Sequence, residues 1–476
     1  MNNKLKIAFE NLGPLKKAEI ELNNLTIITG ENNVGKTYLT YAVYFLLQQS
    51  STIRYKLATK YNFNQDPLMK KVLNLLMTEK KIEISFEQAT KLQELLLVGY
   101  LSEFLPKMAE YFNVDAESFS KLTASLSGLI TRPSRLFWGG AQIMGELLIR
   151  EKKKIVYIKM YNEDNSLETV KTILVSLILS FDDDVFALTA ERLGIVLFGK
   201  EMDSHRNNIV EQLQRSNKSS NKKVDLKARA DFITEFTARY SSAVHDNVGY
   251  AREMFSKKKH RGLFESDTRI SSKVEKVIGG TFRVINGSNN VEFYNARVKE
   301  KFNIPLHFAS TSVRSMTLLY HYLKYDAKVS DTIFIDEPES HLSLNNQVEL
   351  IRIIVQCINL GLKFFITTHS DFMVMELNNL IKLDSLINEH STEDDLTLSS
   401  LKKELANKYE IKLGYTKDMA ISPEKVSLYK IEKGQTVKCN VTKEGIENST
   451  FDVAINKLNQ RSDDMDFLFS LNNTEE

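Results

Sequence analysis

The sequence predicts an α/β protein with a mostly parallel, doubly wound sheet, and two parts of the chain carry this prediction. Near the start, an apolar strand at residues 25–29 passes through a glycine-rich turn into an apolar helical pattern at 38–47. Later, short apolar runs alternate with amphipathic helical patterns between residues 306 and 366. Strands that alternate with helices form parallel sheets, and ligands bind at the carboxyl ends of such strands.

The bulk composition describes an ordinary globular protein with more than one structural unit. The chain has 476 residues, of which 42% are hydrophobic and 26% are charged, so two or three units are expected. A net charge of +2 at pH 7 excludes a protein dominated by either sign of charge. Only Cys357 and Cys439 occur, which is too few for a disulfide framework or a structural zinc site and fits a reducing cytoplasm.

No segment has the pattern of a signal peptide or of a membrane span. Residues 1–6 lack the apolar core of a signal peptide. The most apolar stretch, at 173–181, is far shorter than the ~20 residues that a membrane span needs, so it is expected to be a core helix or strand. We therefore expect a cytoplasmic protein without a membrane partner.

Hydrophobic periodicity and turn residues place the remaining elements along the chain. In the first half we expect a hairpin of residues 4–9 and 17–22 turned by Gly13 and Pro14, mostly helix at 48–149, a strand at 154–161, and polar, basic, helix-like residues at 199–277. In the second half we expect strands at 281–285, 291–294, 306–309, 332–335, 363–366, 426–431 and 436–441, with helices around 316–323 and 348–358.

The run of residues 30–37 has the spacing of a phosphate-binding loop. It is a Gly-x4-Gly-Lys-Thr sequence between the predicted strand and helix, where backbone N–H groups can cradle nucleotide phosphates. Lys36 would reach the β- and γ-phosphates, and the Thr37 hydroxyl would ligate Mg²⁺. The residues expected to bind the nucleotide are Gly30, Glu31, Asn32, Asn33, Val34, Gly35, Lys36 and Thr37.

Two adjacent carboxylates follow the apolar strand at 332–335. Asp336 can address Mg²⁺, while Glu337 can orient or deprotonate an attacking water, because Pro338 starts a turn directly after them. His369 ends the next strand, where its imidazole could sense a γ-phosphate by a hydrogen bond. No other histidine has the spacing of a metal ligand, so Mg²⁺ is the only metal expected.

Hydroxyl residues join the predicted strand at 306–309 to the following helix. Ser310, Thr311 and Ser312 lie at the start of that helix, where free N–H groups attract anions. By itself such a cluster usually only caps the helix. Its position about twenty residues before Asp336 makes it a further candidate for contact with the nucleotide.

The phosphate loop, the hydroxyl cluster, the paired acids and the histidine, in this order along the chain, resemble the ABC-type ATPase heads of the RecF, SMC and OLD (overcoming lysogenization defect) families. The sequence is most similar to the OLD-type AAA ATPases of bacterial phage-defence systems. Residues 30–37 match the family's phosphate loop, residues 336–342 its extended Walker B motif, and residues 368–370 its H-motif. The resemblance covers residues 1–50 and 280–385, and the long separation of the two parts fits an inserted domain.

The resemblance implies a P-loop NTPase head of ABC type that uses ATP and Mg²⁺, with an antiparallel β subdomain and an inserted helical domain. The implied division is residues 1–50 and 279–385 for the two parts of the head, 51–150 for a helical insertion, 151–198 for strands associated with the head, 199–278 for a basic helical insertion, and 386–476 for closing strands and a helix.

Residue by residue, the resemblance implies that Lys36 binds phosphate, that Thr37 and Asp336 hold Mg²⁺, that Glu337 is the catalytic base and that His369 senses the γ-phosphate. It also implies that the signature motif of one protomer caps the ATP of another, with Thr311 as the signature hydroxyl and Arg314 at the polar position. The sequence departs from the family at two places: it has a serine at 312 where the family prefers glycine, and it has Ser343 and Leu344 where the family continues His-Pro. A motif at 190–194 also resembles one in the family but has no assigned role.

The function that the resemblance implies is an oligomeric ATPase subunit that controls a separate nuclease or toxin, similar to the ATPases of the PARIS and Septu systems. Many OLD proteins carry a Toprim nuclease, but too few residues follow Ser370 for one, and Asp464 and Asp466 lie in a polar tail. We therefore expect no intrinsic nuclease.

The alternative function is a DNA-repair ATPase similar to RecF and SMC that binds duplex DNA through the basic insertion. Such lysine-rich runs are often only solvated helix faces, so the sequence leaves open whether this one binds DNA or an acidic protein partner. The basic residues concerned are Arg215, Lys218, Lys222, Lys223, Lys227, Arg229, Lys257, Lys258, Lys259 and Arg261.

Overall fold

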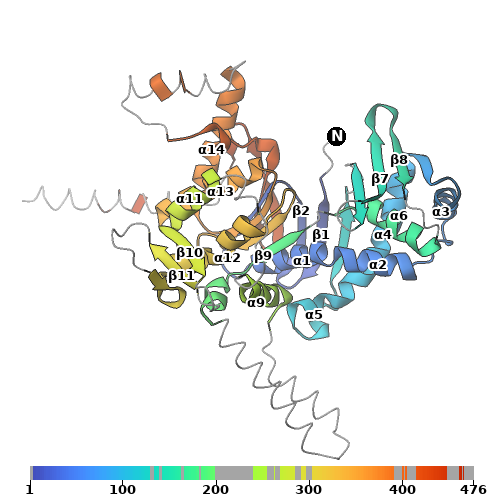
Figure 1. The fold of residues 1–476 in the computed structure, drawn as a ribbon, viewed down its shortest axis with the longest axis horizontal. Helices are drawn as coiled ribbons and strands as arrows, with labels where there is room; N and C mark the ends of the chain where they lie inside the picture. Colours follow the sequence, from blue (N-terminus) through green and yellow to red (C-terminus); the bar gives the residue numbers. More distant parts are fainter. Residues whose placement is uncertain are drawn as a thin grey trace, which may run out of the picture.

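The computed structural model shows a large central sheet covered by helices on both faces (Figure 1). The part of the chain that the structure describes comprises residues 4–128, 133–138, 142–161, 166–181, 184–198, 240–254, 262, 268–284, 291–295, 303–390, 399–400, 402–404, 414–447, 460–461, 463 and 465.

The central sheet has nine strands and joins the two ends of the chain. Their order is β5 (Thr123–Ser127), β1 (Lys6–Leu12), β2 (Leu15–Glu21), β16 (Gln435–Cys439), β15 (Val426–Glu432), β3 (Leu25–Gly30), β14 (Lys363–Thr368), β13 (Thr332–Asp336) and β9 (Val185–Leu188). Every pair from β15 to β9 is parallel, whereas β1 pairs antiparallel with β2 and β5, and β16 with β15. The predicted mostly parallel sheet with an antiparallel part is therefore confirmed.

The register of three parallel strands brings distant segments to one edge of the sheet. Thr29 of β3 lies beside Thr368 of β14, and Thr367 lies beside Asp336 of β13. Because these strands are parallel, their carboxyl ends lie together, as expected for a ligand site in an open α/β sheet.

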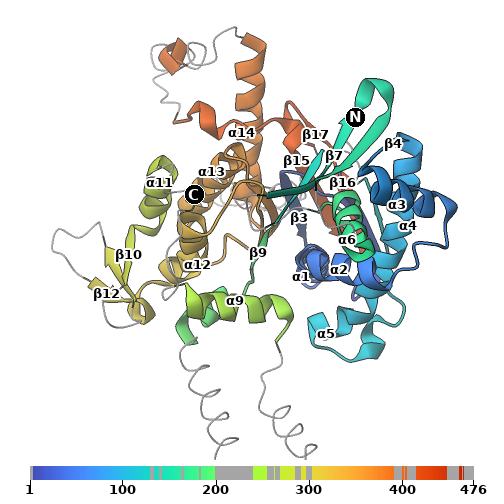
Figure 2. The ribbon, with the colours of Figure 1, turned by 45° about the vertical axis from the view of Figure 1, so that its right-hand side comes forward.

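Alternating side chains of the central strands build two separate cores. Phe334 and Phe365 point to one face, where they pack in the same cluster as helix α1 (Lys36–Gln48). Ile333 and Ile366 point to the other face. That second face is covered by α12 (Thr311–Tyr325), α13 (Leu344–Asn359) and α14 (Asp371–His390), as Figure 2 shows. The period of two in these strands thus specifies a three-layer arrangement.

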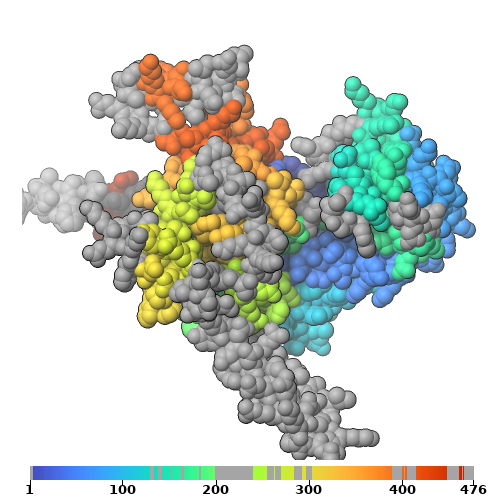
Figure 3. All heavy atoms as spheres, viewed as in Figure 1, coloured from blue at the N-terminus to red at the C-terminus, as the bar shows by residue number. Residues whose placement is uncertain are grey.

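The region between α1 and β9 packs mainly on the α1 side of the molecule. Its helices are α2 (Ser50–Lys60), α3 (Pro67–Glu79), α4 (Phe86–Phe104), α5 (Met108–Phe112) and α6 (Leu167–Ile178). The apolar stretch predicted as a core helix or strand at 173–181 is mostly the end of α6. Figure 3 shows this region, in blue to green, on one side of the molecular surface, and residues after 268, in yellow to red, on the other.

The prediction that residues 48–149 are mostly helical was wrong in part. They also contain β5 and three strands of a separate antiparallel sheet, in which β8 (Ile155–Met160) is the strand predicted at 154–161. That sheet has the order β4 (Lys81–Ser85), β8, β7 (Gln142–Arg150), β6 (Ser134–Trp138). In β4, only the buried Ile82 and Ile84 alternate with exposed residues, and this pattern is too short to identify a strand between two helices. The segment is a strand because it pairs with the distant β8.

One strand expected in the second half is absent. Residues 306–309 form a 3-10 turn, Leu306–Phe308, after the three-residue strand β12 (Asn303–Pro305). Phe308 is 77% exposed, so this apolar run does not face a core, and Pro305 cannot donate to a continuing strand ladder.

The other predicted strands are confirmed as β10 (Gly280–Val284), β11 (Val291–Asn295), β13, β14, β15 and β16, and the opening hairpin as β1 and β2.

The basic region predicted at 199–277 is described only in part. Residues 199–239 and 255–261 lie outside the described residues, and with them all ten basic side chains named for that region. The described parts are α9 (Ser242–Glu253) and α11 (Thr268–Ile278). Asp464 and Asp466 also lie outside. Among the described helices, none combines the length and the apolar character required to span a bilayer.

Replacing Phe365 tests the core between β14 and α1. The ring is 1% exposed and stacks on Phe334 with centroids 5.1 Å apart. Phe365→Ala should lower the free energy of unfolding by about 3–5 kcal/mol, because the cavity adds to the lost apolar burial. Chemical denaturation measures this change. Val437→Ala, at a 49% exposed position on β16, is the matched control and should have little effect.

Candidate nucleotide site

The phosphate loop, residues 30–37, wraps around the start of α1 in a backbone shape that requires glycine. Gly30 and Gly35 have φ of +146° and +105°, and Asn33 has a φ of +61°. A Cβ at position 35 would lie 2.8 Å from the Leu15 Cγ and 2.9 Å from the Pro14 Cγ. The opening hairpin therefore closes on the loop, and any side chain at position 35 would clash with it.

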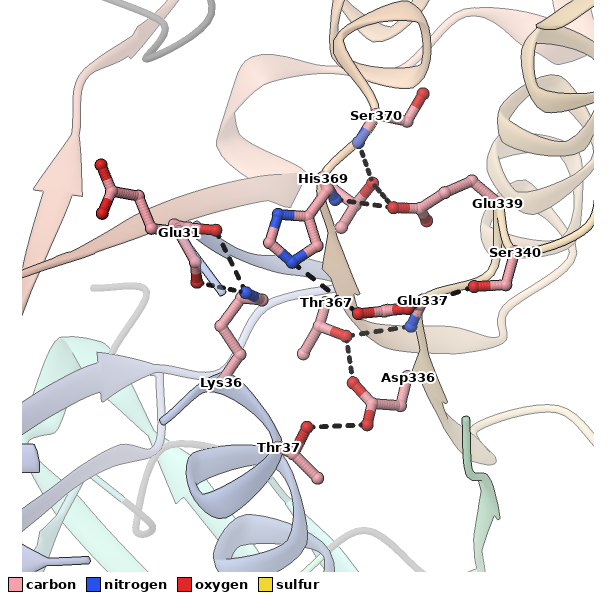
Figure 4. A network of polar contacts seen from close by, with 12 residues as sticks. Glu31, Lys36, Thr37, Asp336, Glu337, Glu339, Ser340, Thr367, His369 and Ser370 are labelled. Carbon is pink, nitrogen blue, oxygen red and sulfur yellow. Dashed lines mark hydrogen bonds and ion pairs between the residues drawn. The ribbon is translucent and has the colours of Figure 1, made fainter. Parts of the chain in front are cut away.

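Lys36 is held inside this loop. Its side chain is buried, and its ammonium donates to the Gly30 carbonyl at 3.1 Å and to the Glu31 carbonyl at 2.7 Å (Figure 4). Burial lowers the pKa of Lys36, while Glu337 and Asp336 oppose this shift by favouring the charged form. The positive charge thus lies close to both the carbonyls of the phosphate loop and the carboxylates at the end of β13.

Asp336 connects the two halves of the site. Its Oδ2 accepts a hydrogen bond of 2.9 Å from the Thr37 hydroxyl, 299 positions away in the chain. Its Oδ1 accepts from the Thr367 hydroxyl. Asp336 is 2% exposed, and burial raises its pKa, although both hydroxyl donors lower it. The pair that was expected to hold Mg²⁺, Thr37 and Asp336, is therefore in direct contact.

Glu337 is the second residue of the acidic turn, residues 336–340, and has an unusual conformation. Its φ of +49° is the left-handed region, which a residue with a side chain adopts only when its surroundings hold it there. Its backbone N–H donates to the Thr367 hydroxyl at 3.0 Å, and its Oε2 accepts from the Ser340 hydroxyl at 3.1 Å. Thr367 therefore positions both Asp336 and Glu337.

His369 faces Glu337 from the end of β14. Its Nε2 lies 3.7 Å from the Glu337 Oε1 and is buried without a hydrogen-bond partner. Burial, and then the charge of Lys36, lowers the pKa of His369, so the imidazole is neutral at pH 7. A buried nitrogen without a partner beside a phosphate loop can bind an anionic oxygen.

Two residues without an assigned role in the sequence complete the arrangement. Glu339 accepts from the Thr368 hydroxyl at 2.9 Å and from the His369 backbone N–H at 2.6 Å, so it fixes the histidine relative to the acidic turn. The only sign of this role in the sequence was the place of Glu339 within residues 336–342, the segment that resembles the Walker B motif. Arg192 is buried and donates to the backbone carbonyls of Asp336 and Glu337. It belongs to the motif at 190–194.

The hydroxyl cluster does not join this site within one chain. Ser310 caps α12 by accepting from the Val313 N–H at 3.4 Å, and its hydroxyl lies 3.0 Å from that of Ser312. Ser310 and Thr311 are exposed. Among the described residues, no hydrogen bond connects Ser310, Thr311 or Ser312 with the phosphate loop or the acidic turn.

The donor set of the site fits a divalent cation. Burial raises the pKa of Asp336 and of Glu339, and the charge of Glu337 raises both further. Three carboxylates so close together repel one another unless a cation compensates their charge. Oxygen ligands of this type suit Mg²⁺, and Thr37 would contribute a hydroxyl oxygen beside Asp336.

Comparison with known proteins supports the class of the site. A family model described as AAA ATPase domain matches residues 3–374, and the chain belongs to this family. Endonuclease GajA from Bacillus cereus (strain VD045) is 25% identical over 402 residues, which cover 81% of this chain. The match covers 58% of the length of that endonuclease.

Two solved SMC head domains are also similar to the chain. The head from Pyrococcus furiosus, with an extended coiled coil and the C-terminal domain of ScpA bound, has 11% identity, coverage of 96% of this chain and 98% of that chain, and a TM-score of 0.30. The head from Thermotoga maritima has 12% identity, coverage of 78% and 92%, and a TM-score of 0.29. TM-scores this low do not establish a shared fold, so the sheet order described above defines the architecture.

Asp336→Asn tests the electrostatic cost of the acidic turn. The variant removes a buried charge that Glu337 repels but keeps the size of the side chain. We expect the Tm of the nucleotide-free protein to rise by about 1–3 °C at neutral pH.

The gain should shrink as the pH falls. The folded-state pKa of Asp336 is raised, so its charge destabilises the fold above that value and no longer does so once the folded and unfolded forms are both protonated. Differential scanning fluorimetry across pH measures this. A variant less stable than the wild type at neutral pH would contradict a net cost of burying the Asp336 charge.

Proposed function

We propose that this AAA ATPase-domain protein binds Mg-ATP at the phosphate loop, hydrolyses it, and controls a separate nuclease or toxin in bacterial anti-phage defence. The observation that carries the nucleotide part is the 2.9 Å hydrogen bond between the hydroxyl of Thr37 and the carboxylate of Asp336. It places the phosphate loop and the Walker B strand against each other, as nucleotide hydrolysis requires.

The proposed hydrolysis uses residues already in contact. Lys36 and the N–H groups of the phosphate loop bind the phosphates, and Thr37 and Asp336 would hold Mg²⁺, which supplies compensating positive charge. The water oxygen forms a bond to the γ-phosphorus while the bond to the ADP oxygen breaks, and the water proton passes to the Glu337 carboxylate. Neutral His369 donates from Nε2 to a γ-phosphate oxygen.

Self-association is part of the proposal. Ser310 and Thr311 are exposed and Ser312 is half-buried at the start of α12, and among the described residues no hydrogen bond connects them with the phosphate loop. Such a helix start binds anions. We propose that it contacts the ATP of a second copy, with Thr311 as the signature hydroxyl. The Cβ of Ser312, where the family prefers glycine, would limit how closely the two copies approach.

The effector part rests on the related endonuclease and on the resemblance to defence ATPases. GajA is named an endonuclease, and the match to this chain covers only 58% of it. From the resemblance to the ATPases of the PARIS and Septu systems, we propose that this chain supplies the ATPase and that a separate protein supplies the nuclease or toxin.

The second candidate function is a DNA-repair ATPase. The basic residues between 215 and 261 favour it, since clustered lysines and arginines bind the phosphates of duplex DNA. Salt-sensitive binding of duplex DNA by this chain alone would support the repair function, whereas indifference to DNA combined with capture of a neighbouring gene's product would support the effector function.

Lys36→Ala should weaken ATP binding. Removing the ammonium leaves the phosphates without their charged donor, so the Kd for ATP should rise by about 10- to 100-fold. Fluorescent-nucleotide titration measures the Kd, and circular dichroism checks that the fold is intact. Lys363→Ala, at the start of β14, is a matched control. An unchanged Kd in a folded Lys36 variant would refute the site.

Glu337→Gln should bind ATP normally and hydrolyse it about 10²- to 10⁴-fold more slowly, because the proton acceptor is lost. Phosphate release measures turnover, and mass photometry with ATP measures assembly. The variant should therefore accumulate the ATP-bound oligomer. Turnover at the wild-type rate would remove Glu337 from the role of base, and a monomer with ATP bound would contradict self-association.

A further inference from the structure

Arg192 binds the backbone of the acidic turn through its guanidinium group. Its Nη1 donates to the Asp336 carbonyl at 2.8 Å, and its Nη2 donates to the Glu337 carbonyl at 2.7 Å. Nη1 also donates to the Thr189 carbonyl at 3.2 Å, three positions earlier in the chain. One guanidinium group therefore ties the end of β13 to the segment that follows β9.

The burial of this arginine is costly and needs a reason. Arg192 is 3% exposed, and burial lowers the pKa of its guanidinium, although Asp336, Glu339 and Glu337 oppose the shift. No ion pair with those carboxylates is formed: the N–H groups bind carbonyl oxygens instead. A planar guanidinium presents its donors in a fixed fork, so it holds the two carbonyls in one relative orientation, whereas the ammonium of a lysine rotates freely.

The two carbonyls belong to the point where the backbone is strained. Glu337 has a φ of +49°, and its own carbonyl accepts from both Arg192 and the Ser340 N–H. A left-handed glutamate persists only when its neighbours fix it. The conformation determines where the Glu337 carboxylate points, and in the structure this carboxylate lies 3.7 Å from the His369 Nε2.

We propose that Arg192 is a positioning residue that holds Glu337 in the orientation for hydrolysis, and that α9 sets the position of Arg192 through Thr189. This inference rests on the proposed ATPase function. It assigns a role to the motif at 190–194, in which Arg192 acts on the backbone of the base and does not touch ATP.

Contacts of α9 provide the link to the rest of the molecule. The buried Asn247 accepts from the Thr189 N–H at 3.0 Å and donates to the Ala187 carbonyl on β9. The next residue towards the N-terminus, Asp246, accepts from the Tyr44 hydroxyl on α1 at 2.7 Å. α9 therefore contacts both the helix that begins at the phosphate loop and the segment that carries Arg192.

This arrangement gives hydrolysis a point of control. α9 is a described element of the region predicted as basic at 199–277, and it contacts both β9 and α1. A displacement of α9 would reach the acidic turn through Asn247, Thr189 and Arg192. A shift of about 1 Å in a catalytic group can change a rate 100-fold.

The test compares Arg192→Ala and Arg192→Lys with Arg352→Ala, measuring kcat, KM, the Kd for ATP and the Tm. Arg352 is a matched arginine that pairs with Glu349 and Glu376 away from the site. We expect Arg192→Ala to lower kcat about 100-fold with Kd and KM nearly unchanged, and Arg192→Lys to retain part of the rate. Arg352→Ala should lower Tm without lowering kcat.

Chemical rescue separates positioning from general stability. Millimolar guanidinium should raise kcat of Arg192→Ala, where it can occupy the vacated space, but not of Glu337→Gln. The double variant Arg192→Ala/Asn247→Ala should be no slower than Arg192→Ala alone, because both act through one chain of contacts. Asn247→Ala alone should lower kcat with KM unchanged.

Four outcomes would overturn the inference. They are a wild-type kcat in folded Arg192→Ala, equal losses of kcat in Arg192→Ala and Arg352→Ala, additive effects of Arg192 and Asn247, and a wild-type protein that does not turn over ATP. The last outcome removes the proposed function as well. The first two leave ATP hydrolysis intact and remove only the role of Arg192, and additive effects remove its link to α9. If Arg192→Ala does not fold, Arg192→Lys and Asn247→Ala carry the same comparison.

Discussion

The structure depends on the parallel pairing of β14 with β3 and β13. This pairing is the constraint that joins residues near the start of the chain to residues more than three hundred positions later. Its register sets Thr29 beside Thr368 and Thr367 beside Asp336, so the phosphate loop, the acidic turn and His369 share one edge. The contact of Thr37 with Asp336, and those of Thr367 and Thr368 with the acidic turn, follow from that alignment.

Charge is distributed unevenly across this edge. Three carboxylates, from Asp336, Glu337 and Glu339, lie close together, and burial raises the pKa of the first and the third. On one side Lys36 is held by carbonyls of the phosphate loop, and below the turn Arg192 is held by carbonyls of the turn itself. Both cations therefore bind backbone rather than carboxylates, which leaves the acidic oxygens available to a divalent cation and to water.

The local sequence pattern is sufficient to predict some of the helices and strands but not all of them. β3, α1, β13, α13 and β14 match the predictions because each has a long apolar period and clear end signals. β4 was missed because five residues with two buried isoleucines do not distinguish a strand from a helix end. The turn at Leu306–Phe308 was mistaken for a strand because composition alone does not report that Phe308 faces solvent.

The sequence by itself determined the P-loop, the paired acids and the histidine, because phosphate and Mg²⁺ chemistry demands particular residue types at short, fixed spacings. The roles of these residues in hydrolysis stay proposals. Only the tertiary structure decided that Thr37 touches Asp336, that Glu339 holds the His369 backbone, and that Arg192 supports a left-handed Glu337. These contacts join residues far apart in the chain, and strand register and burial, which no local pattern encodes, bring them together.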